Sequence, residues 1–313
     1  MPPRPRPASA RAFARAGLLG NPSDVYGGKA IAFTFREFLA EVSVEPAERL
    51  VLPADPDAAR LLRAALGRLP EAALERLAAG TSGEPLLAVR FHTNIPRQVG
   101  LAGSSAIVVA ALRAACAACD VEIHPAELAE WALAAEAEDL GIVAGPMDRV
   151  VQAYGGLVHM DFRPPRGPHS YRRLDPGLLP PLFVAWDPEP GEPSGVPHAR
   201  VRERWLAGDP SVREAMAVFP RLVDEGLRCL EGGDVAGLQR LVDRNFDTRA
   251  SIWPLRERDL AMVRIGRAEG AAVKFCGSGG AVLGVLRAAA EYPAVERAYA
   301  RAGFRALQPV VAP

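Results

Sequence analysis

Apolar positions recur along the chain with two spacings, and each spacing predicts one kind of element. Short runs that alternate or are apolar throughout predict strands over 30–35, 42–52, 86–94, 155–160, 170–174 and 182–186, with 155–160 and 170–174 paired. Apolar residues three or four positions apart predict helices over 58–79, 105–119, 125–138, 210–230, 235–247 and 255–269. A strand-loop-helix-strand unit over 273–310 ends the pattern. Strands and helices mix in both halves without the regular alternation of a parallel doubly wound sheet, which favours an α+β fold.

A cluster of prolines divides this pattern. Pro176, Pro180 and Pro181 interrupt the periodicity near the middle of the chain. Because 313 residues can bury two modest cores, we expect one domain over 1–178 and a second over 179–313. The first ten residues are rich in Pro and Arg, a composition that predicts disorder.

The charge balance excludes some classes of partner. The 37 Lys and Arg residues equal the 37 Asp and Glu residues, so the chain has no general basic surface for nucleic acid or an anionic membrane. Affinity for an anion must therefore come from a local site. Neither a secretory signal pattern nor an apolar run long enough to span a bilayer is present, so we expect a cytoplasmic protein with no membrane partner.

The cysteines do not predict a metal centre. Cys116 and Cys119 form a C-x-x-C pair inside an Ala-rich helical stretch, and neither a second such pair nor a His pair completes a zinc site. We expect both to be buried small apolar residues.

One glycine-rich segment predicts a phosphate-binding loop. Residues 96–106 read Pro-Arg-Gln-Val-Gly-Leu-Ala-Gly-Ser-Ser-Ala, between a predicted strand and a long helix that begins near Ala106. Gly100 and Gly103 allow a tight turn close to an anion, and the helix start offers free N–H groups and a positive dipole end. The spacing is neither a Walker A motif nor a dinucleotide-binding fingerprint. A glycine-rich helix start without a ligand is the alternative.

Three further segments lie in a fixed order around this loop. They are 15–24 (Arg-Ala-Gly-Leu-Leu-Gly-Asn-Pro-Ser-Asp), 144–150 (Ala-Gly-Pro-Met-Asp-Arg-Val) and 274–281 (Lys-Phe-Cys-Gly-Ser-Gly-Gly-Ala). With the loop, they resemble the GHMP small-molecule kinases, and within that superfamily the glucuronokinase family. The resemblance covers nearly the whole chain and includes 154–158, 204–206 and 244–247. It implies an N-terminal domain of the ribosomal-protein type, a C-terminal ferredoxin-like domain and an active site between them.

The resemblance also implies ATP and Mg²⁺ as cofactors and gives residues to hold them. The expected ATP-binding residues are Pro96, Gly100, Leu101, Ala102, Gly103, Ser104, Ser105, Ala106, Gly277, Ser278 and Gly279. Glu136 lies twelve residues before Asp148, as the magnesium-binding carboxylate lies before the catalytic Asp in galactokinases, so Glu136 and Ser105 are the expected metal ligands. Glu138 and Asp139 are expected to face solvent instead.

Two residues are expected to be catalytic. Asp148 would accept the proton of the attacking hydroxyl, and Arg15 would lie beside it and stabilise charge on the transferred phosphoryl group. The alternatives are a helix-capping role for Asp148 and a surface position for Arg15.

The substrate-binding residues expected from the resemblance are Asn21, Asp24, Tyr26, Asp148, Asn245 and Arg249. Asn21 stands where galactokinases have a Glu near the sugar C6 hydroxyl, and a neutral amide avoids repulsion of a uronate carboxylate. Arg97, Arg149 and Arg249 are candidates to bind that carboxylate. Cys276 stands where family members usually have Ser or Thr, so contacts from its side chain are not expected.

These features together predict a sugar-1-kinase. We expect it to phosphorylate the anomeric hydroxyl of D-glucuronate with ATP, giving glucuronate 1-phosphate, and to be a monomer or homodimer whose partners are the uronic acid and ATP. The alternatives are a kinase of galacturonate, arabinose or a heptose derivative, and a GHMP-fold protein that binds sugar without catalysis.

Overall fold

The structure is a computed structural model that describes residues 5–77, 85–143, 145–166, 168–189 and 195–313. The chain forms two packing units that interleave along the sequence. The first unit comprises Met1–Ala14, Phe38–Ile95 and Ala102–Tyr154, and the second comprises Arg15–Glu37, Pro96–Leu101 and Gly155–Pro313. Each unit is assembled from several segments, so the two units do not correspond to a division at one position of the chain. The domains 1–178 and 179–313 therefore stay a prediction.

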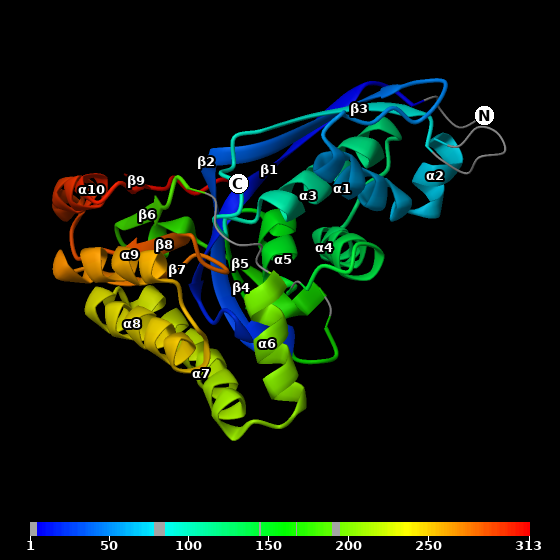
Figure 1. Ribbon diagram of the computed structural model, residues 1–313. Helices are drawn as coiled ribbons and strands as arrows, with labels where there is room; N and C mark the ends of the chain where they lie inside the picture. Colours follow the sequence, from blue (N-terminus) through cyan, green and yellow to red (C-terminus); the bar gives the residue numbers. More distant parts are fainter. Residues whose placement is uncertain (1–4, 78–84, 144, 167, 190–194) are drawn as a thin grey trace. The chain divides into compact units, whose positions relative to one another are not determined.

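The first unit combines a small sheet with helices (Figure 1). The later part of β2 (Lys29–Pro46) pairs antiparallel with β3 (Leu87–Thr93), from Ala40 opposite Thr93 to Pro46 opposite Leu87. The helices are α1 (Pro56–Gly67), α2 (Glu71–Leu77), α3 (Gly103–Ala118), α4 (Pro125–Ala134) and α5 (Met147–Tyr154), and α4 continues into the π-helical turn Ala135–Asp139. Helix α3 is buried along most of its length and packs against α1, α4 and α5.

The second unit contains two sheet regions. The early part of β2 pairs with β4 (Leu157–Asp161), which pairs with β5 (Tyr171–Leu174). A separate antiparallel sheet has the order β7 (Ala272–Phe275), β8 (Ala281–Val285), β6 (Leu182–Trp186), β9 (Arg305–Leu307). Short 3-10 turns occupy Ser23–Tyr26, Pro168–Ser170, Pro176–Leu178 and Ala289–Glu291.

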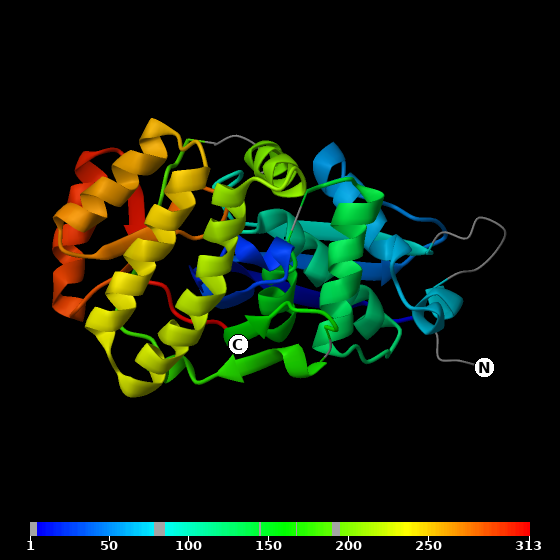
Figure 2. The same cartoon turned by 90° about the horizontal axis from the view of Figure 1, so that it is seen from below.

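The helices of the second unit pack against this sheet or against one another. They are α6 (Gly195–Leu206), α7 (Pro210–Gly232), α8 (Val235–Ile252), α9 (Glu257–Ala268) and α10 (Tyr292–Arg301). Figure 2 shows α7 and α8 side by side as a long hairpin. Phe183, Val273 and Tyr299 are fully buried in the core, and the Tyr299 hydroxyl donates to the Met262 carbonyl at 2.7 Å.

The mixed strands and helices confirm the α+β prediction, and most predicted elements are present. The predicted strands 30–35 and 42–52 form one continuous strand, β2. The predicted helix 58–79 is divided into α1 and α2 around Pro70, which cannot continue a helix from the preceding turn; residues 78 and 79 lie outside the described residues. The predicted helix 125–138 changes to π-helical geometry at Ala135.

The prediction of disorder for the first ten residues is wrong for residues 8–10. Strand β1 (Ala8–Leu19) begins there and lies beside β2, whereas residues 1–4 lie outside the described residues. The strand was not predicted, because alternating Ala and Arg give little intrinsic strand preference. Pairing with β2 supplies the backbone hydrogen bonds that local composition does not indicate.

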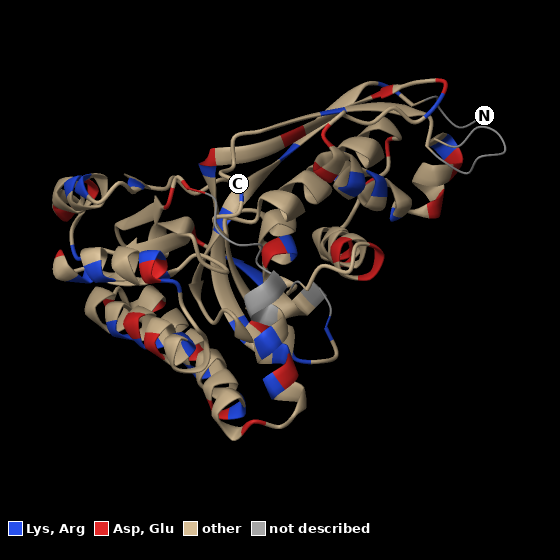
Figure 3. Cartoon of the chain, in the orientation of Figure 1, with Lys and Arg blue, Asp and Glu red and all other residues tan. Residues whose placement is uncertain are grey.

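In the second unit, many charged residues occur on the helices. Figure 3 shows them along α7, α8 and α9, whereas the strands β6, β7 and β8 are almost free of charge. The exception is Lys274 of β7, which is buried. No helix in the described ranges is both long and apolar enough to cross a membrane.

The burial of Cys116 and Cys119 agrees with the sequence prediction. Cys116 and Cys119 are both buried, and burial raises the pKa of the Cys116 thiol to about 12. Among the described residues, no three His, Cys, Asp or Glu side chains gather as a metal site.

Candidate active site

The predicted phosphate loop has an unusual backbone. Gln98, Gly100 and Ala102 all have positive φ, at 58°, 72° and 63°. Left-handed residues alternating with ordinary ones turn successive N–H groups toward one side, which makes a concave site for an anion. Non-glycine residues in this conformation are strained, and such strain is concentrated at functional sites.

The helix after the loop has a free N-terminus. Helix α3 begins at Gly103, earlier than predicted, so Ser104 and Ser105 lie in its first turn. The N-cap residue is Ala102, whose side chain makes no capping hydrogen bond, and the first turn of α3 contains no acidic residue. The first N–H groups of α3 therefore keep their capacity to bind phosphate. Ser105 is buried, and its hydroxyl donates to the Ala102 carbonyl at 3.2 Å, which leaves its oxygen lone pairs available.

Two glycine-rich loops of the second unit pack backbone against backbone. A Cβ atom on Gly100 would lie 2.4 Å from the Gly279 carbonyl oxygen, and one on Gly280 would lie 2.7 Å from the Val99 Cα. Side chains at these positions have no space. This close packing explains why glycine occupies positions 100 and 280. A glycine-rich helix start, the alternative interpretation of the loop, would not explain it as well.

Arg15 connects these two loops. Its side chain is 3% exposed, and Nη1 donates to the carbonyls of Gly100 at 2.7 Å and Cys276 at 3.4 Å. The alternative of a surface arginine is therefore wrong. Arg15 belongs to the second unit and Asp148 to the first, so their proximity stays a prediction.

Arg249 and Asp259 hold the loop 277–280 from the other side. Arg249 donates from Nη1 to the Gly277 carbonyl at 2.6 Å and from Nη2 to the Ser278 carbonyl at 2.9 Å, and its guanidinium stacks on Trp253. Asp259 accepts the Gly280 N–H at 2.9 Å. Burial lowers the pKa of Arg249 to about 10. These bonds give Arg249 a positioning role, and its direct contact with the sugar stays a prediction.

Replacement of Gly100 by alanine tests the loop packing. We expect Gly100→Ala to destabilise the fold by at least 1–2 kcal/mol, roughly the cost of a left-handed alanine, and to weaken ATP binding further because the Gly279 backbone must move. Thermal unfolding and calorimetric titration with ATP measure both effects. Gly67→Ala is the control, because a Cβ atom on Gly67, at the end of α1, would meet nothing within 4 Å. Equal behaviour of the two variants would contradict the tight packing.

Asn245 fixes the loop that contains the predicted sugar-binding residues. It is fully buried on α8; its Oδ1 accepts the Gly20 N–H at 2.8 Å, and its Nδ2 donates to the Asn21 carbonyl at 3.1 Å. Both ends of the amide are thus used by the backbone of residues 20 and 21. A direct bond from Asn245 to substrate stays a prediction.

Lys274 is a site residue that the sequence reasoning did not identify. It is 1% exposed, and its Nζ donates to the Asn21 Oδ1 at 2.6 Å, the Gly17 carbonyl at 2.6 Å and the Phe275 carbonyl at 2.8 Å. Burial lowers its pKa to about 7, and the positive charges of Arg249 and Arg15 lower it further. A lysine in an otherwise apolar strand of a chain with only two lysines was the available signal.

Asp24 and Tyr26 lie on the 3-10 turn after Asn21. Asp24 is 8% exposed, and the Tyr26 ring packs on Trp205 of α6 with 4.7 Å between the ring centroids. Burial raises the pKa of Tyr26, and the negative charge of Asp24 raises it further, whereas Arg202 lowers it. A carboxylate next to aromatic rings suits a sugar, because it can bind hydroxyl groups while the rings cover apolar faces.

Glu136 and Asp148, the two predicted active-site acids of the first unit, both lie close to Arg149. Glu136 is fully buried in the π-helical turn, and its Oε2 accepts from Nε and Nη2 of Arg149 at 2.8 and 2.5 Å. Arg149 Nη1 also donates to the Gly145 carbonyl and lies 3.8 Å from the Asp148 Oδ2. Arg149 is therefore engaged with these acids, which argues against its role as the uronate ligand.

The oxygen atoms of Glu136 and Ser105 have the chemistry that a magnesium ion requires. The Glu136 Oε1 is buried and has no hydrogen-bond partner within the described residues. Mg²⁺ prefers carboxylate and hydroxyl oxygens and binds through few protein ligands. The two acids and Arg149 leave one net negative charge, which also favours a cation.

The neighbouring acids lie at the surface as expected. Glu138 is 67% exposed and pairs with Arg68 at 2.9 Å, and Asp139 pairs with the same guanidinium at 2.5 Å. Arg97 is exposed. Asp148 is 20% exposed in the first turn of α5, so it is accessible to a ligand as a base must be.

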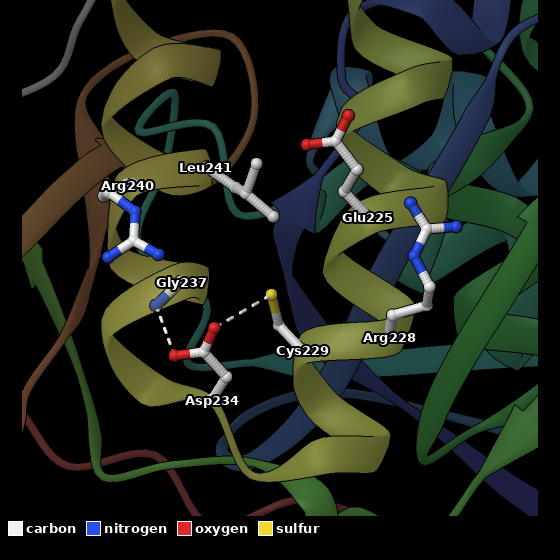
Figure 4. A pocket seen from close by; sticks show the side chains of 7 residues that line it. All are labelled: Glu225, Arg228, Cys229, Asp234, Gly237, Arg240 and Leu241. Atoms are coloured by element: carbon white, nitrogen blue, oxygen red, sulfur yellow. Dashed lines mark hydrogen bonds between the residues drawn. The ribbon is translucent and has the colours of Figure 1, made fainter.

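A separate pocket lies between α7 and α8 (Figure 4). Its volume is about 340 Å³, and it is lined by Glu225, Arg228, Cys229, Asp234, Gly237, Arg240 and Leu241. Asp234 caps α8 by accepting the Gly237 N–H at 2.7 Å. The lining contains none of the predicted site residues.

The chain resembles known proteins over nearly its whole length. Residues 60–156 match the family model of the GHMP kinases N terminal domain. Glucuronokinase 1 of Arabidopsis thaliana is 39% identical over 339 residues, covering 96% of this chain and 91% of the relative. A second Arabidopsis thaliana protein, described as probable glucuronokinase 2, is 38% identical over 333 residues, covering 90% of this chain and 88% of the relative.

The fold is also found in a solved structure. A D-glycero-D-manno-heptose 1-phosphate kinase from Bacteriodes thetaiotaomicron superposes with a TM-score of 0.72 at 19% identity, covering 97% of this chain and 96% of the other. The chain belongs to the GHMP kinase family. It is an ATP-dependent sugar kinase, with near-full-length similarity to the plant glucuronokinases.

Proposed function

We propose that the enzyme transfers the γ-phosphoryl group of ATP to the anomeric hydroxyl of D-glucuronate and releases glucuronate 1-phosphate and ADP. The charge around the sugar-binding loop favours a uronate. Lys274, Arg249 and Arg15 are all buried in the second unit, and burial together with the charges of the two arginines lowers the pKa of Lys274. The negative charges of Asp259 and Asp24 act on Arg249, and Asn21 adds no third negative charge against the three cations. A site with this excess of positive charge favours an anionic sugar over a neutral one. The similarity to glucuronokinases supports the same substrate.

The proposed transfer uses one base and one set of phosphate ligands. Asp148 accepts the proton of the anomeric hydroxyl while the oxygen forms a bond to the γ-phosphorus and the bond to the ADP oxygen breaks. Backbone N–H groups of the phosphate loop and of α3 bind the phosphates. Arg15 keeps the loops containing Gly100 and Cys276 together and adds positive charge.

Glu136 and Ser105 would hold Mg²⁺. The ion would neutralise charge on the phosphate oxygens. Arg149 orients Glu136 through Oε2 and leaves Oε1 for the metal. Asn21 and Asp24 would bind the sugar.

We place the enzyme in the cytoplasm.

Steady-state kinetics with a panel of sugars tests the substrate. We expect glucuronate to give the highest kcat/KM among glucuronate, galacturonate, glucose, galactose, arabinose and a heptose phosphate, with ATP and Mg²⁺. Glucose is the matched control for the carboxylate, because the two sugars differ only at C6. A neutral sugar or a heptose phosphate used about tenfold better, a preference of about 1.4 kcal/mol, would overturn the assignment.

A further inference from the structure

The three hydrogen bonds of Lys274 use all its donors. Its acceptors are the carbonyls of Gly17 and Phe275 and the side-chain oxygen of Asn21, and none is a carboxylate. An ammonium group has three N–H donors and no acceptor. Lys274 therefore has no donor left for a substrate and acts through the groups that it holds.

The contact with Lys274 determines which way the Asn21 amide faces. Because lysine only donates, the atom at 2.6 Å from Nζ must be the amide oxygen. The amide nitrogen then faces away from Lys274. In the described part of the chain, this nitrogen has no hydrogen bond to the protein. It is also not among the side-chain nitrogen and oxygen atoms that are fully buried without a partner, so some of its surface is accessible. It is a donor that a ligand can use.

The backbone around Asn21 is fixed as well. Asn245 binds the N–H of Gly20 and the carbonyl of Asn21, and the Gly17 N–H donates to the Cys276 carbonyl at 2.8 Å. A Cβ atom on Gly17 would lie 3.0 Å from the Asn21 Oδ1, so the glycine leaves the space that the amide oxygen occupies. The Asn21 amide is thus held in one orientation from several sides.

Asn21 also leaves the charge of Lys274 uncancelled. An aspartate at this position would pair with the ammonium, whereas the neutral amide only accepts a hydrogen bond. A net positive charge then remains one side chain away from the free amide donor. A donor backed by a buried cation is a chemically suitable partner for a carboxylate.

We propose that Lys274 is a positioning residue that turns the Asn21 amide nitrogen toward the substrate carboxylate, and that this pair selects a uronate over the corresponding neutral hexose. The inference rests on the proposed function, because it assigns the recognition of C6 at the same site. Asn21 contacts the sugar, whereas Lys274 acts through Asn21.

Asn21→Asp is the most direct test. The variant keeps the side-chain shape and gains an ion pair with Lys274, but it presents an oxygen in place of the donor. We expect its KM for glucuronate to rise at least about tenfold, in line with the loss of a charged hydrogen bond, while the KM for ATP changes less than about threefold. Asn94→Asp is the control, because Asn94 is an exposed amide whose Oδ1 also accepts a hydrogen bond, from the Leu39 N–H.

The pH dependence separates positioning from a purely structural role. With a pKa of about 7 in the folded enzyme, Lys274 is charged below pH 7 and loses its third donor as the pH rises. The cations next to Lys274 are Arg249 and Arg15, and the Cys276 thiol also lies close to it. Burial lowers the pKa of Arg249 to about 10 and raises that of Cys276 to about 12, and both values lie above the range between about pH 6 and 8.5. We expect kcat/KM for glucuronate to fall over this range relative to kcat/KM for ATP, and the fall to disappear in Lys274→Met.

The outcomes distinguish the two proposals. A wild-type enzyme that prefers glucose to glucuronate overturns the proposed function. A wild-type preference for glucuronate that Asn21→Asp leaves unchanged overturns the Lys274–Asn21 pairing alone. If Lys274→Met does not fold, Asn21→Asp and the wild-type pH profile still decide the matter, since an unchanged KM for glucuronate in the first and a flat relative profile in the second each contradict the pairing.

Discussion

Replacement of Asp148 by asparagine is expected to lower kcat about a hundredfold or more, which corresponds to about 2.7 kcal/mol of lost transition-state stabilisation. The amide keeps the volume and the position in the first turn of α5 but can no longer accept the proton of the anomeric hydroxyl. Nucleotide binding should survive, because the phosphate loop and the N-terminus of α3 are unchanged. Single-turnover kinetics together with ATP titration measure the two effects separately.

The control for this variant is a carboxylate outside the site. Asp120→Asn removes one exposed negative charge of the first unit, at the end of α3, and should leave kcat unchanged. If Asp148→Asn keeps wild-type turnover, Asp148 caps or positions the helix and the base is another group. If ATP binding is lost together with turnover, the variant reports on folding of the site and not on proton transfer.

The second large effect concerns the metal. Glu136→Gln and Ser105→Ala should each raise the Mg²⁺ concentration needed for half-maximal rate, because each removes an oxygen ligand from a cation that sheds water reluctantly. If both oxygens bind one ion, the double variant should lose less than the sum of the two single losses in free energy. Activity titrated against Mg²⁺ for the four proteins gives these values.

Glu138→Gln is the matched control for Glu136→Gln. Glu138 lies on the same π-helical turn but is exposed and paired with Arg68, so its replacement should leave the Mg²⁺ dependence unchanged. Unchanged dependence in both Glu136→Gln and Ser105→Ala would place the metal elsewhere. A shift in Glu138→Gln instead would place it on the outer side of the turn.

The glycine-rich loop was predictable because its chemistry is local. Gly100, Gly103 and the serines lie within a few residues, and the following helix has a clear apolar periodicity. The positive φ angles of Gln98 and Ala102 were not predictable, since neither residue type favours them. They accompany the close packing of this loop against Gly279 and Gly280, which are far away in sequence.

The partners of the buried charges could not be read from the sequence either. Lys274 binds two carbonyl oxygens and one amide oxygen, and backbone oxygens have no sequence signature. Arg249 was predicted as a candidate carboxylate ligand, and the sequence did not indicate that its Nη1 and Nη2 bind the carbonyls of Gly277 and Ser278. Its buried Nε has no hydrogen-bond partner among the described residues, so a contact with the sugar stays a prediction. The spacing of Glu136 and Asp148 indicated both acids, whereas the intervening role of Arg149 depends on the π-helical turn that the periodicity did not predict.

The most direct test of the central claim is the structure of the product, measured by phosphorus NMR after incubation of the enzyme with D-glucuronate, ATP and Mg²⁺. We expect a new sugar phosphate whose phosphorus couples to the anomeric proton, formed in equal amount with ADP. Phosphorus coupled to a proton at another ring position would contradict phosphorylation at the anomeric hydroxyl. Formation of ADP and inorganic phosphate without a sugar phosphate would contradict the assignment of glucuronate as the phosphoryl acceptor.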